Sequence, residues 1–250
     1  MYNQLIIMNY LSKGGRLLGL LLCLSLAGCL DVAQEIWVYQ DGRGRMTTEV
    51  GLHEQLMLMQ GKQSDETVCD SFFEEKQVLE KHTGVESVDY NTYKEGGVFY
   101  CVSDIKVDDY TALASLQDAL LKGSAIDANK DDFQTEFILK LQQDGNGYFR
   151  QHIRNQVGDP NKPKLEAHAE RFTNVIMGHM MTGRYWTLTL HSPKIVTANG
   201  KISEDKKTVS WRVPLYDLLI NEQYAFDMQA TFYVNVPWYK KFWNWMTKHE

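Results

Sequence analysis

The stretch QTEFILKLQQDGNGYFRQHIR, residues 134–154, decides the class of fold, because in it two strand-like segments flank a tight turn. The turn, Asp144-Gly145-Asn146-Gly147, consists of glycine and Asp/Asn residues, which tolerate the positive φ angles of hairpin turns. It separates Gln134–Leu141 from Tyr148–Arg154, and the pattern predicts an antiparallel hairpin. Two more pairs of segments have the same form: Ile36–Gln40 and Met46–Val50 around Asp41-Gly42-Arg43-Gly44, and Val85–Tyr93 and Val98–Ile105 around Glu95-Gly96-Gly97.

Helical patterns lie between these hairpins. Asp109–Lys122 begins with acidic residues, carries the leucine stripe Leu113, Leu116 and Leu120, and meets a stop signal at Gly123. Three more helices are expected at Leu52–Gln60, Asp65–His82 and Lys164–Thr182, and three more strands at Tyr185–Leu190, Lys207–Val213 and Tyr224–Val236. This order predicts an α+β fold, an antiparallel sheet built from hairpins with helices packed on one side. No linker interrupts residues 29–236, so we expect a single domain there, with 157–163 as the boundary if there are two.

The sequence Leu-Ala-Gly-Cys at residues 26–29 has the form of a lipobox, the signal that makes a cysteine the lipid-bearing first residue of a bacterial lipoprotein. Lys13 and Arg16 form the positive flank, and Leu17–Leu26 form the apolar segment. This segment is too short to span a bilayer, which takes roughly 20 apolar residues, and it suits a cleaved signal. We therefore expect residues 1–28 to be a lipoprotein signal peptide and Cys29 to be lipidated. The alternative is an ordinary secretory signal with a coincidental cysteine.

The expected location is the cell envelope. Leu30 follows the lipidated cysteine, where aspartate often signals retention in the inner membrane, so we expect the outer membrane, facing the periplasm, if the organism has two membranes. Loss of residues 1–28, which carry two basic residues and no acidic one, changes the net charge from −6 to −8. Nucleic-acid binding relies on Lys and Arg that neutralise phosphates, so an acidic chain is a poor candidate for it.

Two cysteines remain besides Cys29 and the Cys23 of the signal: Cys69 and Cys101. Outside the cytoplasm two such thiols usually pair, so we predict a disulfide. Cys69 lies in a helical pattern and Cys101 in a strand-like run, which makes it a helix-to-strand bridge. The alternative is a pair of buried free thiols.

A methionine-rich segment lies in the predicted helix Lys164–Thr182. Methionine fills irregular apolar space and suits adaptable binding surfaces, and thioether and imidazole ligands suit Cu(I). Three interpretations stay open: core packing, an apolar ligand groove, and a metal site of Met177, His179 and Met181. The groove would be formed by Ile176, Met177, Met180 and Met181.

The C-terminal residues 237–250 have the pattern of a short amphipathic helix that begins at Pro237. Lysines and polar residues occupy one arc of it, which is typical of helices at a membrane interface. The opposite arc, which we expect to contact a membrane or a partner, holds Trp238, Tyr239, Phe242, Trp243, Trp245 and Met246. The alternative is that this helix folds back onto its own domain.

Three features together resemble the mycobacterial LppM-like lipoprotein domain family: Cys29 followed by the strand Val32–Gln40, the Gly84–Ile105 hairpin, and the Trp186–Trp211 segment with its Asn199-Gly200 turn. The likeness spans residues 29–236. It implies an α+β domain comparable to lipid-binding folds and associated with envelope glycolipids, and it implies no catalytic residues. Many relatives end in a spanning helix, whereas this chain has the short amphipathic tail.

The sequence therefore predicts a non-enzymatic envelope lipoprotein that binds a lipid or other hydrophobic ligand and needs no cofactor. Gly-x-Ser-x-Gly, Walker and Gly-x-Gly-x-x-Gly motifs are absent from it. The expected partners are membrane lipid and, as the alternative function, another protein of an envelope assembly. A third interpretation is an enzyme or a copper carrier.

Overall fold

The computed structural model describes residues 30–54, 69, 76–123, 133–155, 181–220 and 224–235. Its strands alternate between buried and more exposed side chains, as expected where one face of a sheet covers a core. The elements are β1 (Leu30–Val38), β2 (Gly44–His53), α4 (Lys76–Glu80), β3 (Val85–Glu95), β4 (Val98–Val107), α5 (Ala112–Gly123), β5 (Phe133–Leu141), β6 (Asn146–Asn155), β7 (Tyr185–His191), β8 (Lys194–Ala198), β9 (Lys201–Ile202), β10 (Thr208–Pro214), α7 (Leu215–Ile220) and β11 (Ala225–Tyr233).

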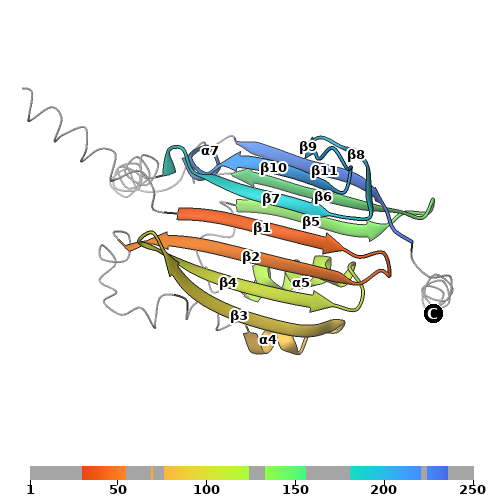
Figure 1. The fold of residues 1–250 in the computed structure, drawn as a ribbon, viewed down its shortest axis with the longest axis horizontal. Coiled ribbons are helices and arrows are strands. Elements are labelled where there is room, and N and C mark those ends of the chain that lie inside the picture. The colour runs from red at the N-terminus through yellow and green to blue at the C-terminus, as the bar shows by residue number, and fades with distance from the viewer. Residues whose placement is uncertain are drawn as a thin grey trace, which may run out of the picture.

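The strands form two sheets (Figure 1). The larger has seven strands in the order β3-β4-β2-β1-β7-β10-β9, and the smaller has four in the order β5-β6-β11-β8. The three hairpins that the turn chemistry predicts are present as the antiparallel pairs β1–β2, β3–β4 and β5–β6. One pair is parallel: β1 lies beside β7, with Val32 opposite Trp186.

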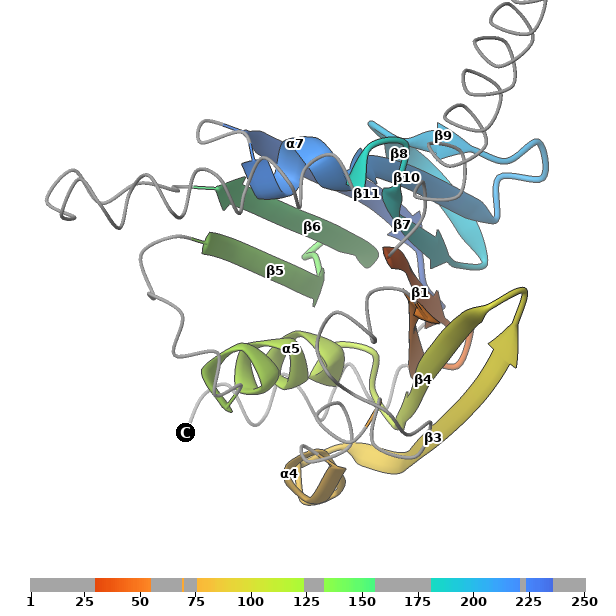
Figure 2. The same cartoon turned by 90° about the vertical axis from the view of Figure 1, so that its left-hand side faces the viewer.

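The two sheets share one hydrophobic core, and α5 lies between β5 and the curved large sheet (Figure 2). Aromatic side chains fill the space between the sheets. The ring centroids of Phe149, in the small sheet, and Trp211, in the large sheet, are 5.5 Å apart. Phe149 also packs edge-on against Phe137. Phe149 and Phe232 are fully buried. Large side chains therefore occupy the interior.

The predicted α+β architecture is wrong, because the described part of the chain is mostly β and a second sheet covers the first. Helices there are short, with five residues in α4, twelve in α5 and six in α7. The physical reason is that alternation along a strand shows which face is apolar, but not whether helices or strands cover that face. The small sheet supplies that cover.

The predicted helices have mixed outcomes. Asp109–Lys122 is present as α5, with Leu113 and Leu116 fully buried and the Asp109 carboxylate accepting from the Thr111 amide at 2.9 Å. The prediction Leu52–Gln60 is wrong at its start, since Leu52 and His53 belong to β2. Of Asp65–His82, residues 76–80 form α4. Lys164–Thr182 lies outside the described residues except for its last two.

Gly147 is the second residue of β6 and packs against the core. A side chain there would meet the Phe232 ring, because its Cβ would lie 2.1 Å from a ring carbon. Phe232 pairs with Gly147 across the β6–β11 ladder, so its ring lies over the glycine. Packing against Phe232 therefore requires a glycine at this position, whereas Gly145 supplies the positive φ of the turn.

The side chain of Asn199 ties the two sheets together. Its Oδ1 accepts from Trp211 Nε1 at 2.8 Å and from the Gln229 amide at 2.9 Å, and its Nδ2 donates to the Asp227 carbonyl at 2.7 Å. Asn199→Ala is expected to lower the free energy of unfolding by about 1–2 kcal/mol, because the buried indole N–H of Trp211 loses its acceptor. Denaturant unfolding checks this, and Asn199→Asp, which retains an acceptor oxygen, should lose less. Equal stability of the alanine variant and the parent would contradict it.

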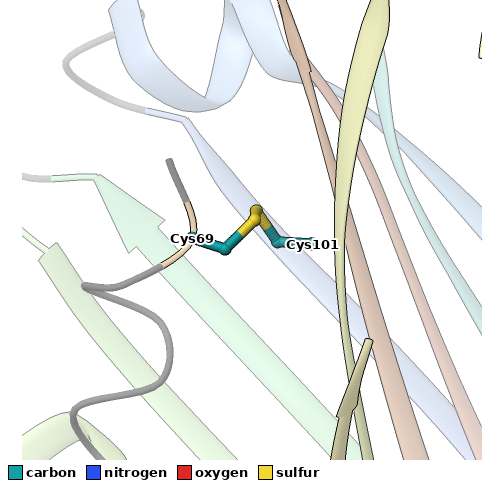
Figure 3. The surroundings of a disulfide bond; sticks show 2 residues. All are labelled: Cys69 and Cys101. Carbon is teal, nitrogen blue, oxygen red and sulfur yellow. A yellow bond between two sulfur atoms is a disulfide. The ribbon is translucent and has the colours of Figure 1, made fainter. Parts of the chain in front are cut away.

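A disulfide joins Cys69 to Cys101 of β4, as the sequence predicts (Figure 3). Their Cα atoms are 5.7 Å apart and 32 residues separate them in the sequence. Both cysteines are buried, in a small cluster with Phe99. Cys69 itself lies in a bend, so the structure does not show the helical end expected for this bridge.

Candidate functional site

A row of aligned residues crosses the outer face of the large sheet near the start of β1. Across neighbouring strands, Tyr93 is opposite Tyr100, Tyr100 is opposite Gly51, and Gly51 is opposite Asp31. The parallel register of β1 and β7 places Asp31 beside Tyr185. The side chains of Asp31, Tyr93, Tyr100 and Tyr185 are not buried, and Gly51 is covered by the Tyr100 ring, so the row faces away from the core.

The Tyr93 and Tyr100 rings stack with their centroids 4.6 Å apart. Tyr100 lies over Gly51, where a Cβ would be 2.8 Å from its ring. Tyr93 donates a hydrogen bond to Glu49 at 2.8 Å. Burial raises the pKa of Tyr93 to about 12, with a further contribution from Glu49, and burial also raises the pKa of Tyr100. Both phenols therefore stay protonated and uncharged at neutral pH.

A cavity of about 350 Å³ opens beside this row. The starts of β1 and β7, the middle of β2 and the end of β10 meet there. The lining consists of Asp31, Val32, Ala33, Glu49, Gly183, Arg184, Tyr185, Thr187 and Arg212. We call this cavity the polar pocket.

Two guanidinium groups lie at the polar pocket. Arg184 Nη1 donates to the Asp31 carboxylate at 2.7 Å, so its charge is balanced within the pocket. Arg212 lies over the Tyr185 ring, with its guanidinium carbon 4.0 Å from the centroid. Among the described residues, no carboxylate lies within ion-pair distance of Arg212. This guanidinium is therefore placed to receive an anionic oxygen, which Arg binds with directed hydrogen bonds.

The polar groups of the lining combine two cations, two carboxylates and hydroxyls. Such a set matches a ligand that carries both an anionic group and hydroxyl or ammonium groups.

A second cluster occupies the other half of the same face. Trp37 of β1 lies between Arg45 of β2 and His191 of β7. The guanidinium carbon of Arg45 is 4.8 Å from the Trp37 ring centroid, and the Trp37 and His191 ring centroids are 4.8 Å apart. Arg45 forms two hydrogen bonds to Asp104, at 2.7 and 2.9 Å, and His191 Nε2 lies 3.0 Å from Glu35. These mutual contacts cover the indole, so this half is packed and charged.

The residues predicted as a possible ligand groove are mostly not described. Ile176, Met177 and Met180 lie outside the described residues, and so does the metal candidate His179. Met181 is part of the main core, with 2% of its surface exposed. Its thioether is therefore a packing group. In the described ranges no cluster of three or more His, Cys, Asp and Glu suits a metal ion.

The predicted membrane residues also lie outside the described ranges. They are Cys29 and the tail residues Trp238, Tyr239, Phe242, Trp243, Trp245 and Met246. Within 30–235, as far as the structure describes it, no helix has the length and apolar character needed to cross a bilayer.

Sequence reasoning missed the polar pocket. Its charged groups come from β1, β2, β10 and the residue before β7, and the register that unites them is the parallel β1–β7 pairing. Single-sequence patterns carry no signal for that pairing. A usable local signal did exist in Tyr93 and Tyr100, which flank the Gly96-Gly97 turn at outward positions and so face each other.

Comparison with known proteins gives a structural likeness. The sequence matches no known protein family, and no curated protein matches it. The fold is similar to the NMR structure of the folded domain of LppM from Mycobacterium tuberculosis, with a TM-score of 0.46 and 14% sequence identity. The likeness covers 84% of this chain and 93% of that chain. The predicted resemblance to LppM-like domains is thus confirmed as a structural match.

Proposed function

We propose that this protein is a non-enzymatic cell-envelope lipoprotein, anchored through Cys29, whose folded domain binds the headgroup of a membrane lipid in the polar pocket. The lipobox at residues 26–29 supports the anchor. The observation that carries the binding site is its position: Asp31, two residues after Cys29, lines the pocket. Two peptide units span at most about 7 Å, so the pocket lies beside the anchor.

The chemistry of the pocket favours a headgroup over an acyl chain. Buried aromatic side chains already fill the interior between the sheets, whereas the pocket is lined by charged groups and hydroxyls. An anionic oxygen of the ligand pairs with Arg212. Hydroxyl or ammonium groups of the same ligand meet the carboxylates of Asp31 and Glu49. The acyl chains remain in the bilayer, so the lipid is recognised without leaving the membrane.

The proposed location is the outer membrane, facing the periplasm, in an organism with two membranes. Leu30 rather than aspartate follows Cys29, which supports release from the inner membrane. If the protein co-fractionates with inner-membrane markers, this placement is wrong.

Arg212→Gln is expected to weaken lipid binding by between about tenfold and a hundredfold, because one charge-assisted hydrogen bond contributes about 1.5–3 kcal/mol. The measurement is native mass spectrometry of the soluble domain that begins at Leu30, titrated with short-chain phosphatidylglycerol. Arg43→Gln is the matched control, since Arg43 directly precedes β2, at the end of that strand away from the anchor, and pairs with Asp41.

Equal affinity of the Arg212 variant and the parent would exclude the pocket as the site. Absence of binding by the parent, together with discrete protein adducts on crosslinking in cells, would favour the alternative function, a protein–protein module of an envelope assembly.

A further inference from the structure

The first strand starts without a linker. Leu30, the residue that follows Cys29, is already paired with Leu52 in the β1–β2 ladder. Resting on the proposed lipidation of Cys29, we propose that this direct attachment docks one end of the sandwich on the bilayer, with Tyr93, Tyr100 and Tyr185 in the headgroup layer. The partner of this surface is the lipid surface itself.

The height of the tyrosines above the anchor follows from sheet geometry. The row that contains them runs across the strands at the level of Asp31, about 7 Å or less along the chain from Cys29. Neighbouring strands are about 4.8 Å apart, so Tyr185 is about 5 Å and Tyr93 about 15 Å sideways from β1. Each headgroup layer is about 5–8 Å thick. The row therefore lies at the level of the headgroups when β1 rises from the membrane.

The distribution of side chains favours an upright rather than a flat orientation. Tyrosine has an apolar ring and a polar tip, which suits the membrane interface. The tyrosine row occupies the half of the face next to Cys29. The half farther from Cys29 holds the ion pair Arg45–Asp104 and the His191–Glu35 contact. Laying the whole face on the bilayer would bring those charged groups against it, whereas standing on the anchored end keeps them away from it.

Electrostatics at the anchored end permit this approach. Arg184 is paired with Asp31, and Lys94 is paired with Glu54 beside the Gly96-Gly97 turn. The mature chain carries a net charge of −8, after loss of Lys13 and Arg16 from a chain of −6. General attraction to anionic lipid is therefore excluded as the cause of docking. The covalent anchor and the tyrosines hold this end of the domain at the bilayer instead.

The test compares two tyrosines with matched exposure at opposite ends of the sheet. Tyr93 and Tyr39 are each 39% exposed. Tyr39 is nine residues along from Leu30, or about 30 Å at the rise of a strand. The full lipidated chain is reconstituted into vesicles of phosphatidylethanolamine and phosphatidylglycerol. Hydroxyl-radical oxidation of each tyrosine is then measured by peptide mass spectrometry, with the soluble domain as the reference.

We expect Tyr93 to be protected several-fold on vesicles and Tyr39 to react as in the soluble domain. A variant with a Gly/Ser linker of about 20 residues between Cys29 and Leu30, which spans about 25 Å, should restore the reactivity of Tyr93. Equal reactivity of Tyr93 and Tyr39 in the parent, or unchanged protection in the linker variant, would overturn the proposal. The mass of the N-terminal peptide reports lipidation separately, so a failure of the anchor itself is distinguished from a failure of docking.

Discussion

Replacing residues 1–29 by a secretory leader that is removed before Leu30 is expected to transfer the protein from the membrane to the soluble fraction. The anchor is the reason: each buried CH₂ group contributes about 0.8 kcal/mol, and two or more acyl chains give stable attachment. Ultracentrifugation with detection of the protein in each fraction measures the transfer. The change is close to complete, which makes it the largest effect expected for this chain.

The matched control removes residues 238–250 from the lipidated protein. This deletion should leave the protein in the membrane fraction, because the acyl chains suffice. A protein that stays with the membrane without Cys29, and leaves it without its tail, would show that the tail is the anchor. That outcome would refute the lipobox argument.

Replacing both Cys69 and Cys101 by serine is expected to lower the free energy of unfolding by about 4 kcal/mol. The disulfide closes a loop between residues 32 apart, and in the chain-entropy model such a cross-link restricts the unfolded chain by that amount. For a domain of this size the melting temperature should fall by about 10 °C. Both positions are changed together because a single change leaves a buried unpaired thiol.

Thermal unfolding of the parent under oxidising and reducing conditions provides the control. The reduced parent should unfold at a temperature close to that of the double serine variant. A loss of under about 1 kcal/mol in both would show that the segment around Cys69 remains associated in the unfolded state, and it would contradict the entropic account.

The local parts of the fold were predictable from the sequence. The three hairpins follow from turns such as Asp144–Gly147 and Glu95–Gly97, whose glycines determine chain reversal within a few residues. The helix Asp109–Lys122 follows from its stripe and stop signal. The element that covers each sheet face could not be predicted, because an apolar strand face packs equally well under a helix or a second sheet.

The candidate site was predictable only at its edge. The cysteine count identifies the pair that the structure joins, whereas the lipidation of Cys29 stays a prediction. Arg184 and Arg212 had no such signal, since isolated arginines next to strands are ordinary surface residues. They gain meaning only from the β1–β7 pairing, which brings Asp31 beside Arg184 across a separation of more than 150 residues.

For the lipoprotein that we propose, the parallel pairing of β1 with β7 also determines when the chain can fold during export. Val32 is opposite Trp186, so the centre of the large sheet waits for a strand that crosses the membrane 154 residues later. Until then β1 and β2 form a hairpin with an open edge, and the translocating chain presents that edge to neighbouring proteins. Such long-range closure is slow. The nascent lipoprotein therefore needs protection from strand pairing with other chains from the moment its first residues emerge until β7 arrives.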